Sequence, residues 1–392
     1  MEDKFANHTY NPEIRFRGYT DGWEQCKLNE ICDYTSSSLT ASSSIENGKY
    51  ILYDANTEIG SVDSFSMNED YITVIKDGAG VGRIRKLPKN TAFTGTMGAL
   101  TSKNKETDFL YYLLERKDLS KQFTGSTIPH IYFKDYGKDA VNIPKDKEQQ
   151  VIGSYFKQLD NLITLHQRKC DTLKNLKASM LTKMFPKEGE SMPEIRFKGF
   201  TDSWEQRKLG DVLERRIEQR QQSEEYPRLA FASGQGVIPL SERKTNNREQ
   251  LTKDEYTKKY LVTELNDIVY NPANVKYGAI DRNKCGRGLI SPIYVTFTTN
   301  EIPGFIERIV TSHDFQQRAL RFEEGTVTKR QSVNPEDLVT LDILVAPKRE
   351  EQQKIATYFD SLDHLITLHQ RKYEKLLDVK KAFLEKMIGG DN

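Results

Sequence analysis

The chain lacks several features that would place it in a common class of protein. Its 392 residues contain no apolar run of about 18 residues, so no membrane span is expected. Only four cysteines occur, without CxxC spacing or neighbouring histidine pairs, which favours free thiols in a reducing cytosol over a disulfide or zinc framework. The first residues have neither the layout of a signal peptide nor a cleavage site. We therefore expect a cytoplasmic protein.

Charge of one sign is not in excess either. Lys and Arg number 58, against 57 Asp and Glu. Such a balance supplies no overall positive field to attract nucleic acid, which argues against a protein that coats DNA without regard to sequence. Local basic patches remain possible.

Motifs of catalysis and metal binding are also missing. The sequence has no GxxxxGK[ST] loop, no GxGxxG after a strand and no HExxH. The glycine-rich "GAGVG" at 78–82 favours a tight turn over a phosphate site, because the letters that follow do not begin a helix. We expect no catalytic residue, no metal and no cofactor in this chain.

What the chain does contain is an internal duplication. "PEIRFRGYTDGWEQCKL" at 12–28 returns as "PEIRFKGFTDSWEQRKL" at 193–209, with 13 of 17 letters identical. "YFKQLDNLITLHQRK" at 155–169 returns at 358–372 with 12 of 15 identical. The offsets are 181 and 203, so the second copy has 203 − 181 = 22 more residues between its repeated segments. A period this long indicates a duplicated domain and not a solenoid.

The stretches between the repeated segments, roughly 29–145 and 210–345, show hardly any mutual similarity. We call them the first and second body. Both contain short β-like runs punctuated by glycine, and helical stretches such as 108–123 lie among them. This mixture predicts an α+β fold for each body, a mixed β-sheet with helices.

A long helix with a seven-residue repeat is expected after each body. The repeat provides a and d positions over about four heptads, and a rod of about 40 helical residues spans about 60 Å. If a two-fold axis relates the two copies, the helices pair as an antiparallel coiled coil that separates the bodies. The predicted seam residues are Leu159, Leu162, His166, Leu173, Leu176, Met180, Leu362, Leu365, His369, Leu376, Val379 and Phe383.

His166 and His369 occupy equivalent seam positions, and two interpretations are open. They could form a polar pair that fixes the register of the helices, as a buried polar residue at an a position can. They could instead be partly exposed imidazoles at the edge of the packing, and we favour this second interpretation.

The predicted domain organisation follows from these elements. The first body with its leading segment covers 1–145, and the first long helix covers 146–185. A linker and the second body cover 186–345, and the second long helix covers 346–392. The only two tryptophans, Trp23 and Trp204, occupy equivalent positions, and we expect both to pack the repeated segments onto the bodies.

A duplicated body, a near-identical helix after each body and the absence of a catalytic motif together resemble the specificity subunit of type I restriction–modification systems. The residues that carry the resemblance are the W-E-Q-x-K-L segments at 23–28 and 204–209, "GSTIPHIYFKD" at 125–135 and the two "EQQ…LITLHQRK" helices. The resemblance covers essentially the whole chain.

The resemblance implies a non-catalytic function in a larger complex. Each body would be a target recognition domain that reads one half of a bipartite, asymmetric site in double-stranded DNA. The helices would set the spacing of the half-sites and dock two methyltransferase subunits, and restriction subunits would join the complex. S-adenosylmethionine is then expected in the methyltransferase subunit, and ATP with Mg in the restriction subunit. The alternative is a non-enzymatic DNA-binding scaffold or regulator with the same duplicated architecture.

Base reading needs Arg, Lys, Asn or Gln on loops that face a groove, while other basic groups hold phosphates. Four turn-rich stretches supply such residues, although any one of them could simply be solvated. The predicted DNA-binding residues are Arg83, Arg85, Lys86, Lys89, His130, Tyr132 and Lys134 in the first body, and Lys276, Tyr277, Arg282, Lys284, Arg287, Lys329, Arg330 and Gln331 in the second.

Overall fold

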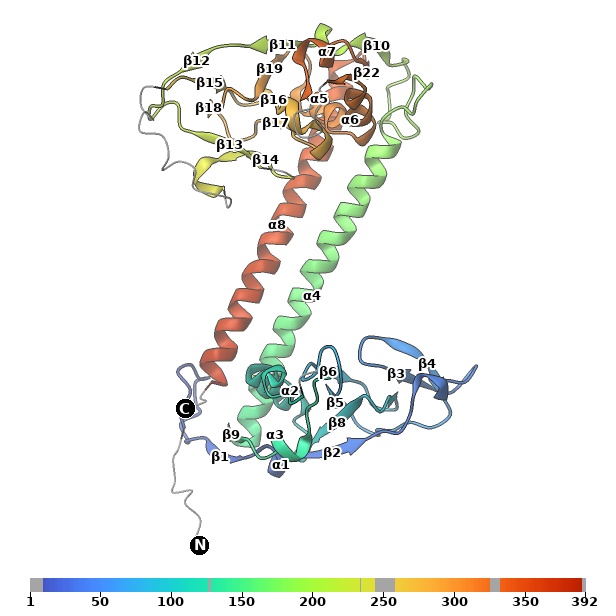
Figure 1. Ribbon diagram of the computed structural model, residues 1–392, viewed down its shortest axis with the longest axis vertical. Helices are drawn as coiled ribbons and strands as arrows, with labels where there is room; N and C mark the ends of the chain where they lie inside the picture. The colour runs from blue at the N-terminus through green and yellow to red at the C-terminus, as the bar shows by residue number, and fades with distance from the viewer. Residues whose placement is uncertain (1–9, 126–127, 233, 244–257, 325–331, 390–392) are drawn as a thin grey trace. The chain divides into compact units, whose positions relative to one another are not determined.

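The computed structural model describes residues 10–125, 128–232, 234–243, 258–324 and 332–389. The chain divides into two compact units, one formed by 1–168 with 369–392 and the other by 169–368 (Figure 1). We call them the first and second unit. Each contains one body together with part of each long helix.

The first body is built on a four-stranded antiparallel sheet. Its strands follow the order β2 (Cys32–Ser36), β8 (Met97–Ser102), β5 (Tyr71–Ile75) and β6 (Ile84–Leu87). All five residues of β5 are buried, because Ile72 and Val74 face one apolar cluster while Tyr71 and Ile75 face another. A strand covered on both faces reads as a continuous apolar run, which explains "YITVI".

Smaller elements complete the first body. A three-stranded sheet contains β4 (Glu58–Val62), β3 (Tyr50–Tyr53) and β7 (Ala92–Phe93). The helices are α1 (Leu28–Ile31), α2 (Thr107–Lys117) and α3 (Phe133–Tyr136), with short 3-10 turns at Ala41–Ser43 and Leu119–Lys121. Phe109 and Leu110 of α2 pack on the same cluster as Ile72, so α2 covers one face of the four-stranded sheet.

The second body repeats this topology despite its different sequence. Its four-stranded antiparallel sheet follows the order β11 (Leu213–Arg216), β19 (Val295–Thr299), β16 (Ile268–Tyr270) and β17 (Ile280–Arg282). In both sheets the first strand along the chain pairs with the last, the last pairs with the second, and the third closes the sheet. Helices α5 (Pro303–Val310) and α6 (His313–Ala319) follow β19 as α2 follows β8.

The remaining elements differ between the bodies. The second body adds a three-stranded sheet of β12 (Gln219–Arg220), β15 (Tyr260–Thr263) and β18 (Gly288–Ile290), a hairpin of β13 (Leu229–Ala232) and β14 (Gly236–Pro239), and the pair β20 (Glu323–Glu324) and β21 (Ser332–Val333). It also has α7 (Pro335–Leu338) and 3-10 turns at Leu209–Asp211, Leu240–Glu242, Pro272–Tyr277 and Leu320–Phe322. The bodies therefore share a central sheet and diverge around it.

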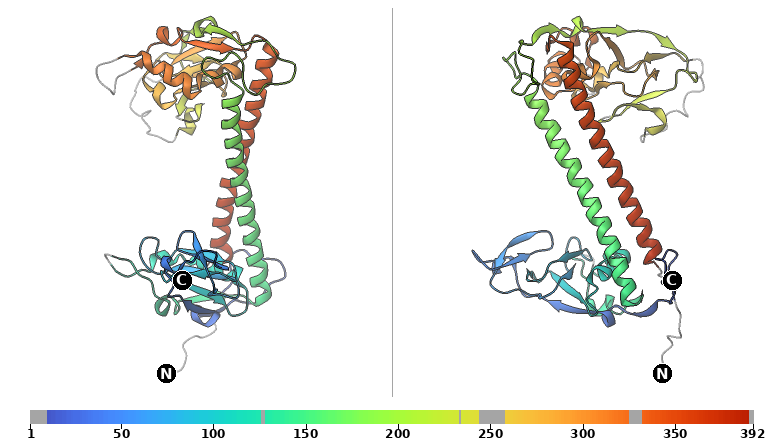
Figure 2. Two further views of the ribbon diagram at one scale, coloured as in Figure 1. Left: turned by 90° about the vertical axis from the view of Figure 1, so that its right-hand side faces the viewer. Right: turned by 180° about the vertical axis from the view of Figure 1, so that it is seen from behind.

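The long helices are α4 (Asp146–Lys183) and α8 (Arg349–Met387). In the first unit they lie side by side and run in opposite directions, since the rings of Tyr155 and Phe383 are 5.8 Å apart and His166 contacts His369 (Figure 2). In the second unit Lys177 of α4 pairs with Asp363 of α8, and the rings of Phe185, just after α4, and Phe359 of α8 are 6.2 Å apart, so the helices run in opposite directions there as well. None of the described helices is long and apolar enough to cross a membrane.

The side chains least exposed along each long helix recur at alternating spacings of four and three residues. These positions are 152, 156, 159, 163, 166, 170, 173, 177, 180 and 184 on α4, and 355, 359, 362, 366, 369, 373, 376, 380, 383 and 387 on α8. The series includes eight of the predicted seam residues, namely Leu159, His166, Leu173, Met180, Leu362, His369, Leu376 and Phe383.

The other predicted seam residues do not lie on this series. Leu162, Leu176 and Leu365 are 43, 39 and 39% exposed, so their assignment to the seam is wrong, and half-buried Val379 lies beside the seam position Lys380. Beside Leu176 and Val379 the seam positions hold Lys177 and Lys380, whose charges are compensated by acidic side chains, and beside Leu162 and Leu365 they hold Ile163 and Ile366. Apolar character alone therefore selected the wrong register on the outer side of the heptad.

Candidate nucleic-acid interface and repeated frame

The repeated segments form a frame that closes each body onto its long helix. Strand β1 (Glu24–Lys27) pairs with β9 (Ala140–Ile143), and β10 (Glu205–Lys208) pairs with β22 (Asp342–Val345) in the equivalent register. The first strand of each pair comes from a W-E-Q-x-K-L segment, and the second leads into α4 or α8. The two ends of each body are thereby joined at the base of a helix.

A buried ion pair holds each frame. Arg15 donates two hydrogen bonds to Glu148, both 2.7 Å long, and Arg196 donates two to Glu351, 2.6 and 2.8 Å long. Both glutamates are almost fully buried. The hydrogen bonds to these carboxylates raise the pKa of both guanidinium groups. Bidentate contacts of this kind combine charge neutralisation with a defined geometry. They therefore set how the leading segment docks on the first turn of the helix.

The "EQQ" letters that begin each long helix are explained by further paired contacts. The Gln149 side chain donates to the Pro144 carbonyl and the Gln352 side chain to the Ala346 carbonyl, each over 2.8 Å. An outer salt bridge, Lys145–Asp21 in one unit and Lys348–Asp202 in the other, is also duplicated. Both partners of each ion pair lie in repeated sequence or directly beside it.

Trp23 and Trp204 are core residues of the two frames. Trp23 is fully buried and meets Phe109 edge-on, with ring centroids 6.2 Å apart. Trp204 is 3% exposed and meets Phe305 at 5.3 Å. The prediction that both indoles pack the frame onto the body is confirmed, and neither is exposed for stacking on a base.

One aspartate of each long helix joins the opposite helix and the body. Asp160 accepts from Tyr112 of α2 at 2.8 Å and pairs with Lys380 of α8 at 2.7 Å. Its counterpart 203 residues later, Asp363, pairs with Lys177 of α4 and accepts from Arg308 of α5 at 2.8 Å. The helix-to-helix contact is thus repeated, while each body supplies its own type of donor.

The electrostatic surroundings of these contacts differ between the units. Burial opposes ionisation of Asp363, but hydrogen bonds and charge from Lys177 and Arg308 outweigh it and lower the pKa of that carboxyl. In the first unit, burial raises the pKa of Glu115, and its partner Lys380 only partly offsets the effect. The ionised carboxylate is therefore favoured at Asp363 and disfavoured at Glu115.

The imidazoles of His166 and His369 are in direct contact. Their Nδ1 atoms are 2.9 Å apart, and both rings are half-buried. One Nδ1 must donate and the other accept, so the pair needs complementary tautomers. This contact supports the interpretation as a polar pair that fixes register over the one that we favoured from the sequence.

The basic cluster predicted at 82–89 is divided between the two faces of β6, because side chains alternate along a strand. Arg85 lies over the Tyr53 ring, 4.9 Å from its centroid, whereas Lys86 turns to Asp108 of α2. Arg83 is exposed, and its guanidinium donates to the Ala55 carbonyl and the Asn56 side chain. Lys89 is exposed beyond the end of the strand. These four residues do not form one patch.

Three predicted residues of the first body do lie together. His130, Tyr132 and Lys134 project from the segment before and into α3, with the His130 and Tyr132 rings nearly parallel at 6.2 Å. The Lys134 ammonium lies 5.2 Å from the centre of the Tyr132 ring. Tyr132 and Lys134 are exposed, so this small group is accessible to a nucleic acid.

In the second body, Arg282 is the clearest correction. Its side chain is 12% exposed and donates to Glu307 of α5, to Asp360 of α8 and to Asn266. All three partners lie within the protein, which contradicts the prediction that Arg282 contacts DNA. Arg282 instead fastens β17 to α5 and α8, and the basic letters of its stretch gave no sign of these acidic partners.

The other predicted residues of the second body are more exposed. Lys284 is paired with Glu307, and Arg287 with Glu225 and Glu264, while both keep almost half of their side-chain surface exposed. Tyr277 is 67% exposed. The side chain of Lys276 and the whole of Lys329, Arg330 and Gln331 lie outside the described residues. DNA contact by these residues stays a prediction.

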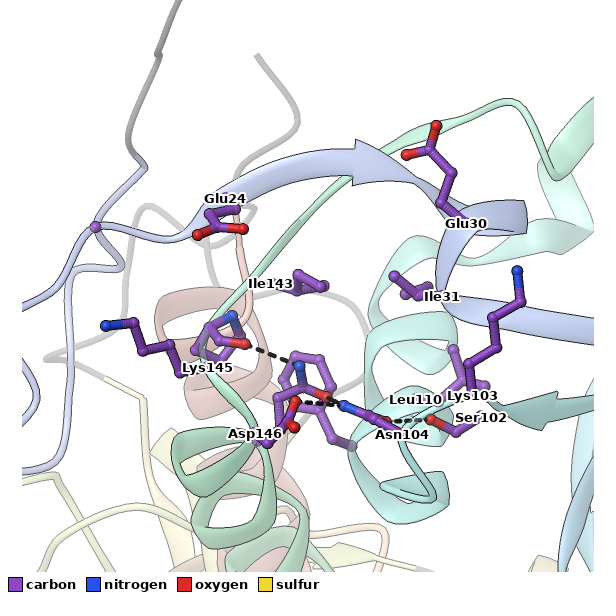
Figure 3. A pocket seen from close by; sticks show the side chains of 14 residues that line it. Glu24, Glu30, Ile31, Ser102, Lys103, Asn104, Leu110, Ile143, Lys145 and Asp146 are labelled. Carbon is purple, nitrogen blue, oxygen red and sulfur yellow. Dashed lines mark hydrogen bonds between the residues drawn. The ribbon is translucent and has the colours of Figure 1, made fainter.

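A pocket of about 420 Å³ lies beside the frame of the first unit (Figure 3). Asn104 connects its wall to α4, donating to Asp146 at 2.8 Å and to Gln149 at 3.0 Å, and it accepts from Ser102 at 2.6 Å. Among the predicted DNA-binding residues that the structure describes, none lines it. These polar groups satisfy one another, which indicates that this wall of the pocket braces the helix start.

Several important residues were not identified from the sequence. Arg15, Glu148, Arg196 and Glu351 all lie in or next to repeated segments, so pairing the repeats against each other could have indicated them. Asp77, which contacts His130, carries no comparable signal, because nothing in the sequence joins positions that are 53 residues apart.

The comparisons with known proteins agree with one another: each finds a specificity domain or subunit of a type I restriction–modification system. Residues 20–175 match the family described as "Type I restriction modification DNA specificity domain". The chain is 26% identical over 357 residues to the type I restriction enzyme MjaVIII specificity subunit of Methanocaldococcus jannaschii, covering 83% of this chain and 79% of that protein. In fold it is similar to the crystal structure of the type I restriction–modification S subunit from M. genitalium, with a TM-score of 0.69 and 14% identity over 98% of this chain and 100% of the other. Over most of its length this chain is thus similar to a specificity subunit of a type I restriction enzyme.

Proposed function

We infer that this chain is the DNA sequence-specificity subunit of a type I restriction–modification complex. The observation that carries this function is a duplicated frame, with the same ion pair in each copy, that holds two bodies of shared central topology and different sequence. Two bodies of different sequence, each held by the same frame, suit a protein that reads two different half-sites. Each body, within 1–145 and 186–345, is then a target recognition domain for one half of a bipartite, asymmetric site in double-stranded DNA.

The long helices, 146–185 and 346–392, are proposed to pair as an antiparallel coiled coil that sets the distance between the half-sites. Supporting this are the alternating four–three series on both helices and the opposite directions of the helices within each unit. A stiff spacer fixes a half-site separation that a flexible linker would leave variable.

The outer sides of these helices are proposed to dock two methyltransferase subunits. In the repeated octapeptide, Leu162 and Leu165 of α4 are 43 and 45% exposed, and Leu365 and Leu368 of α8 are 39 and 38% exposed. Helix pairing does not account for these identical leucines. Two identical partners would need the same surface twice, which gives a reason for the repetition. S-adenosylmethionine then belongs to the methyltransferase, ATP and Mg belong to the restriction subunits, and this chain carries out recognition without catalysis.

The function is tested by mapping methylated adenines in a methylation-free host that expresses this chain with a type I methyltransferase subunit. Modification at a split, asymmetric motif is expected, and exchange of residues 29–145 should change only one half of that motif. If a stable complex of both proteins modifies no site and the chain binds DNA unaided, it is a DNA-binding scaffold or regulator instead.

Docking is tested by co-purification of the methyltransferase subunit with a Leu162→Asp/Leu365→Asp variant. Because these side chains are exposed, the variant should fold, with an unchanged circular dichroism spectrum, and yet lose most of the bound partner. Leu377→Asp is a matched control, since Leu377 is 40% exposed on α8 but lies outside the repeated octapeptide. Equal recovery of the partner with the double variant and the control would contradict the assignment of this surface.

A further inference from the structure

The segment from Phe123 to Lys134 of the first body has an unusual surface. Phe123, Ile128 and Tyr132 are 50, 55 and 47% exposed within this one short stretch. Contiguous exposed apolar patches mark interaction surfaces, so a stretch with three exposed apolar or aromatic side chains is a candidate for one. The two residues of this segment at 126–127 lie outside the description.

Backbone hydrogen bonds hold this segment against the end of β5. The Ile131 amide donates to the Lys76 carbonyl at 2.9 Å, and the Gly78 amide donates to the Pro129 carbonyl at 3.0 Å. Asp77 and His130 therefore face each other across an isolated β-bridge. Their positions are set by main-chain pairing with the central sheet.

The glycine-rich loop 78–82 lies at the base of this arrangement. Gly78, Gly80 and Gly82 all have positive φ, and a Cβ on Gly82 would lie 2.5 Å from the backbone of Leu119 and Ser120. The amides of Gly78, Val81 and Gly82 donate within the protein, so this is the tight turn expected from the sequence. The turn permits the close approach of the chain that leads into the His130 segment.

The side chains of Asp77 and His130 define which His130 nitrogen is available. His130 Nδ1 lies 2.6 Å from Asp77 Oδ1. An ionised carboxylate only accepts hydrogen bonds, so Nδ1 carries the proton, and Nε2 of the neutral ring is left as an acceptor. The ring is partly exposed and lies parallel to Tyr132, and the Lys134 ammonium adds positive charge beside it.

We propose that His130 is a specificity-determining residue of the first body, whose Nε2 accepts a hydrogen bond from an exocyclic base amino group in the major groove. Asp77 is its positioning residue, because it holds the tautomer. The amino groups presented in that groove are adenine N6 and cytosine N4, and both are donors that an imidazole acceptor can read. This inference rests on the proposed function and adds the type of base edge that the first body recognises.

The first experiment compares methylation motifs of the complex with the parent chain and with His130→Ala. One position of the half-site read by the first body should become degenerate, while the second half-site is unchanged. His130→Gln, whose amide oxygen can accept in a similar place, should retain more of the preference than His130→Ala. His313→Ala, at an exposed histidine of the second body, is the matched control and should leave the first half-site intact.

The second experiment removes the amino group from the DNA. Binding of the complex is measured at about pH 8, where a histidine side chain is normally neutral, with purine in place of adenine or pyrimidinone in place of cytosine at the position found above. Loss of the amino group should weaken binding by the parent about 10-fold, in the range expected for a base-edge contact, and should have no further effect with His130→Ala. Only one of the two replacements should act, and it identifies the base.

The outcomes separate this inference from the proposed function. If the parent complex methylates no split motif, the proposed function fails and this inference fails with it. If the parent methylates such a motif and His130→Ala leaves it unchanged, only the reading by His130 is overturned. Sensitivity to a 7-deaza base instead of to loss of the amino group would also overturn it, since a donor would then be reading the base. Asp77→Asn should shift the preference in the same direction as His130→Ala, whereas thermal stability of the folded complex should be unchanged.

Discussion

The two units attach a body to the long helices with one shared set of contacts and one set that differs. Arg15–Glu148 and Arg196–Glu351 are the same contact in two places, and both of its partners lie in repeated sequence or directly beside it. Where only one partner belongs to a helix, the other is free to change. Asp160 accepts from a tyrosine hydroxyl and Asp363 from a guanidinium, for example. Sequence is thus retained where both partners of a contact are duplicated, and it diverges where one partner lies in a body.

The largest expected effect is on the shared contact. Arg15→Ala and Arg196→Ala each leave a buried carboxylate without its cation, and each should lower the free energy of unfolding of its own unit by about 3 kcal/mol. Urea unfolding followed by Trp fluorescence measures this, with Trp204→Phe as the background that lets Trp23 report the first unit, and Trp23→Phe for the second. Arg17→Ala, an exposed position in the same segment, is the control. Clearly unequal losses of unfolding free energy in Arg15→Ala and Arg196→Ala would contradict the equivalence of the two frames.

The contacts that differ should show unequal effects. Arg308→Met removes hydrogen bonds to both Asp360 and Asp363 and should cost about 2 to 3 kcal/mol in the second unit. Tyr112→Phe removes one hydrogen bond to Asp160 and should cost about 1 kcal/mol in the first. The same single-tryptophan backgrounds report each value. A larger loss of unfolding free energy in Tyr112→Phe than in Arg308→Met would contradict this expected order.

Lowering the pH should reduce the contribution of Asp363 to folding stability and should relieve the cost of burying Glu115. The pKa of Asp363 is lowered, so its contribution to stability is complete above the ordinary aspartate value of about 3.9 and is lost as pH falls through the folded-state pKa. The pKa of Glu115 is raised, so its cost is complete above the folded-state pKa and is relieved as pH falls. Unfolding measured below about pH 4 should therefore lose part of its acid sensitivity in Asp363→Asn. Glu115→Gln should instead remove a stabilisation that appears on acidification, and the same sign of change in both variants would contradict the assignments.

The smallest effect is expected at the histidine pair. His166→Leu and His369→Leu each remove the contact between the two Nδ1 atoms, and a double-mutant cycle should give a coupling energy on the order of 1 kcal/mol. The doubly substituted helix pair should be as stable as the parent, since two leucines suit seam positions. Strict additivity of the single changes would show that the Nδ1 contact contributes nothing.

The first body could be described only in outline before its structure was known. Its short β-like runs and the helical stretch at 108–123 were visible as apolar patterns, because burial imposes a local periodicity on the sequence. The grouping of its basic residues was not predictable. Arg85 and Lys86 are neighbours in sequence but lie on opposite faces of β6, and the partner of each comes from a different element. Arg282 of the second body was missed as a structural residue for the same reason.

The duplication, the two long helices, the residues that recur every seven positions along them and the packing of Trp23 and Trp204 could all be inferred from the sequence, because each leaves a repeat or a period in it. The folded chain was needed to show that both bodies share one central sheet order, that lysines occupy two seam positions, that Arg282 forms internal ion pairs and that Asp77 contacts His130. These features depend on pairs of residues far apart in the chain. A lysine or an aspartate has the same letter whether it faces water or a buried partner, so its function is defined by the fold that surrounds it.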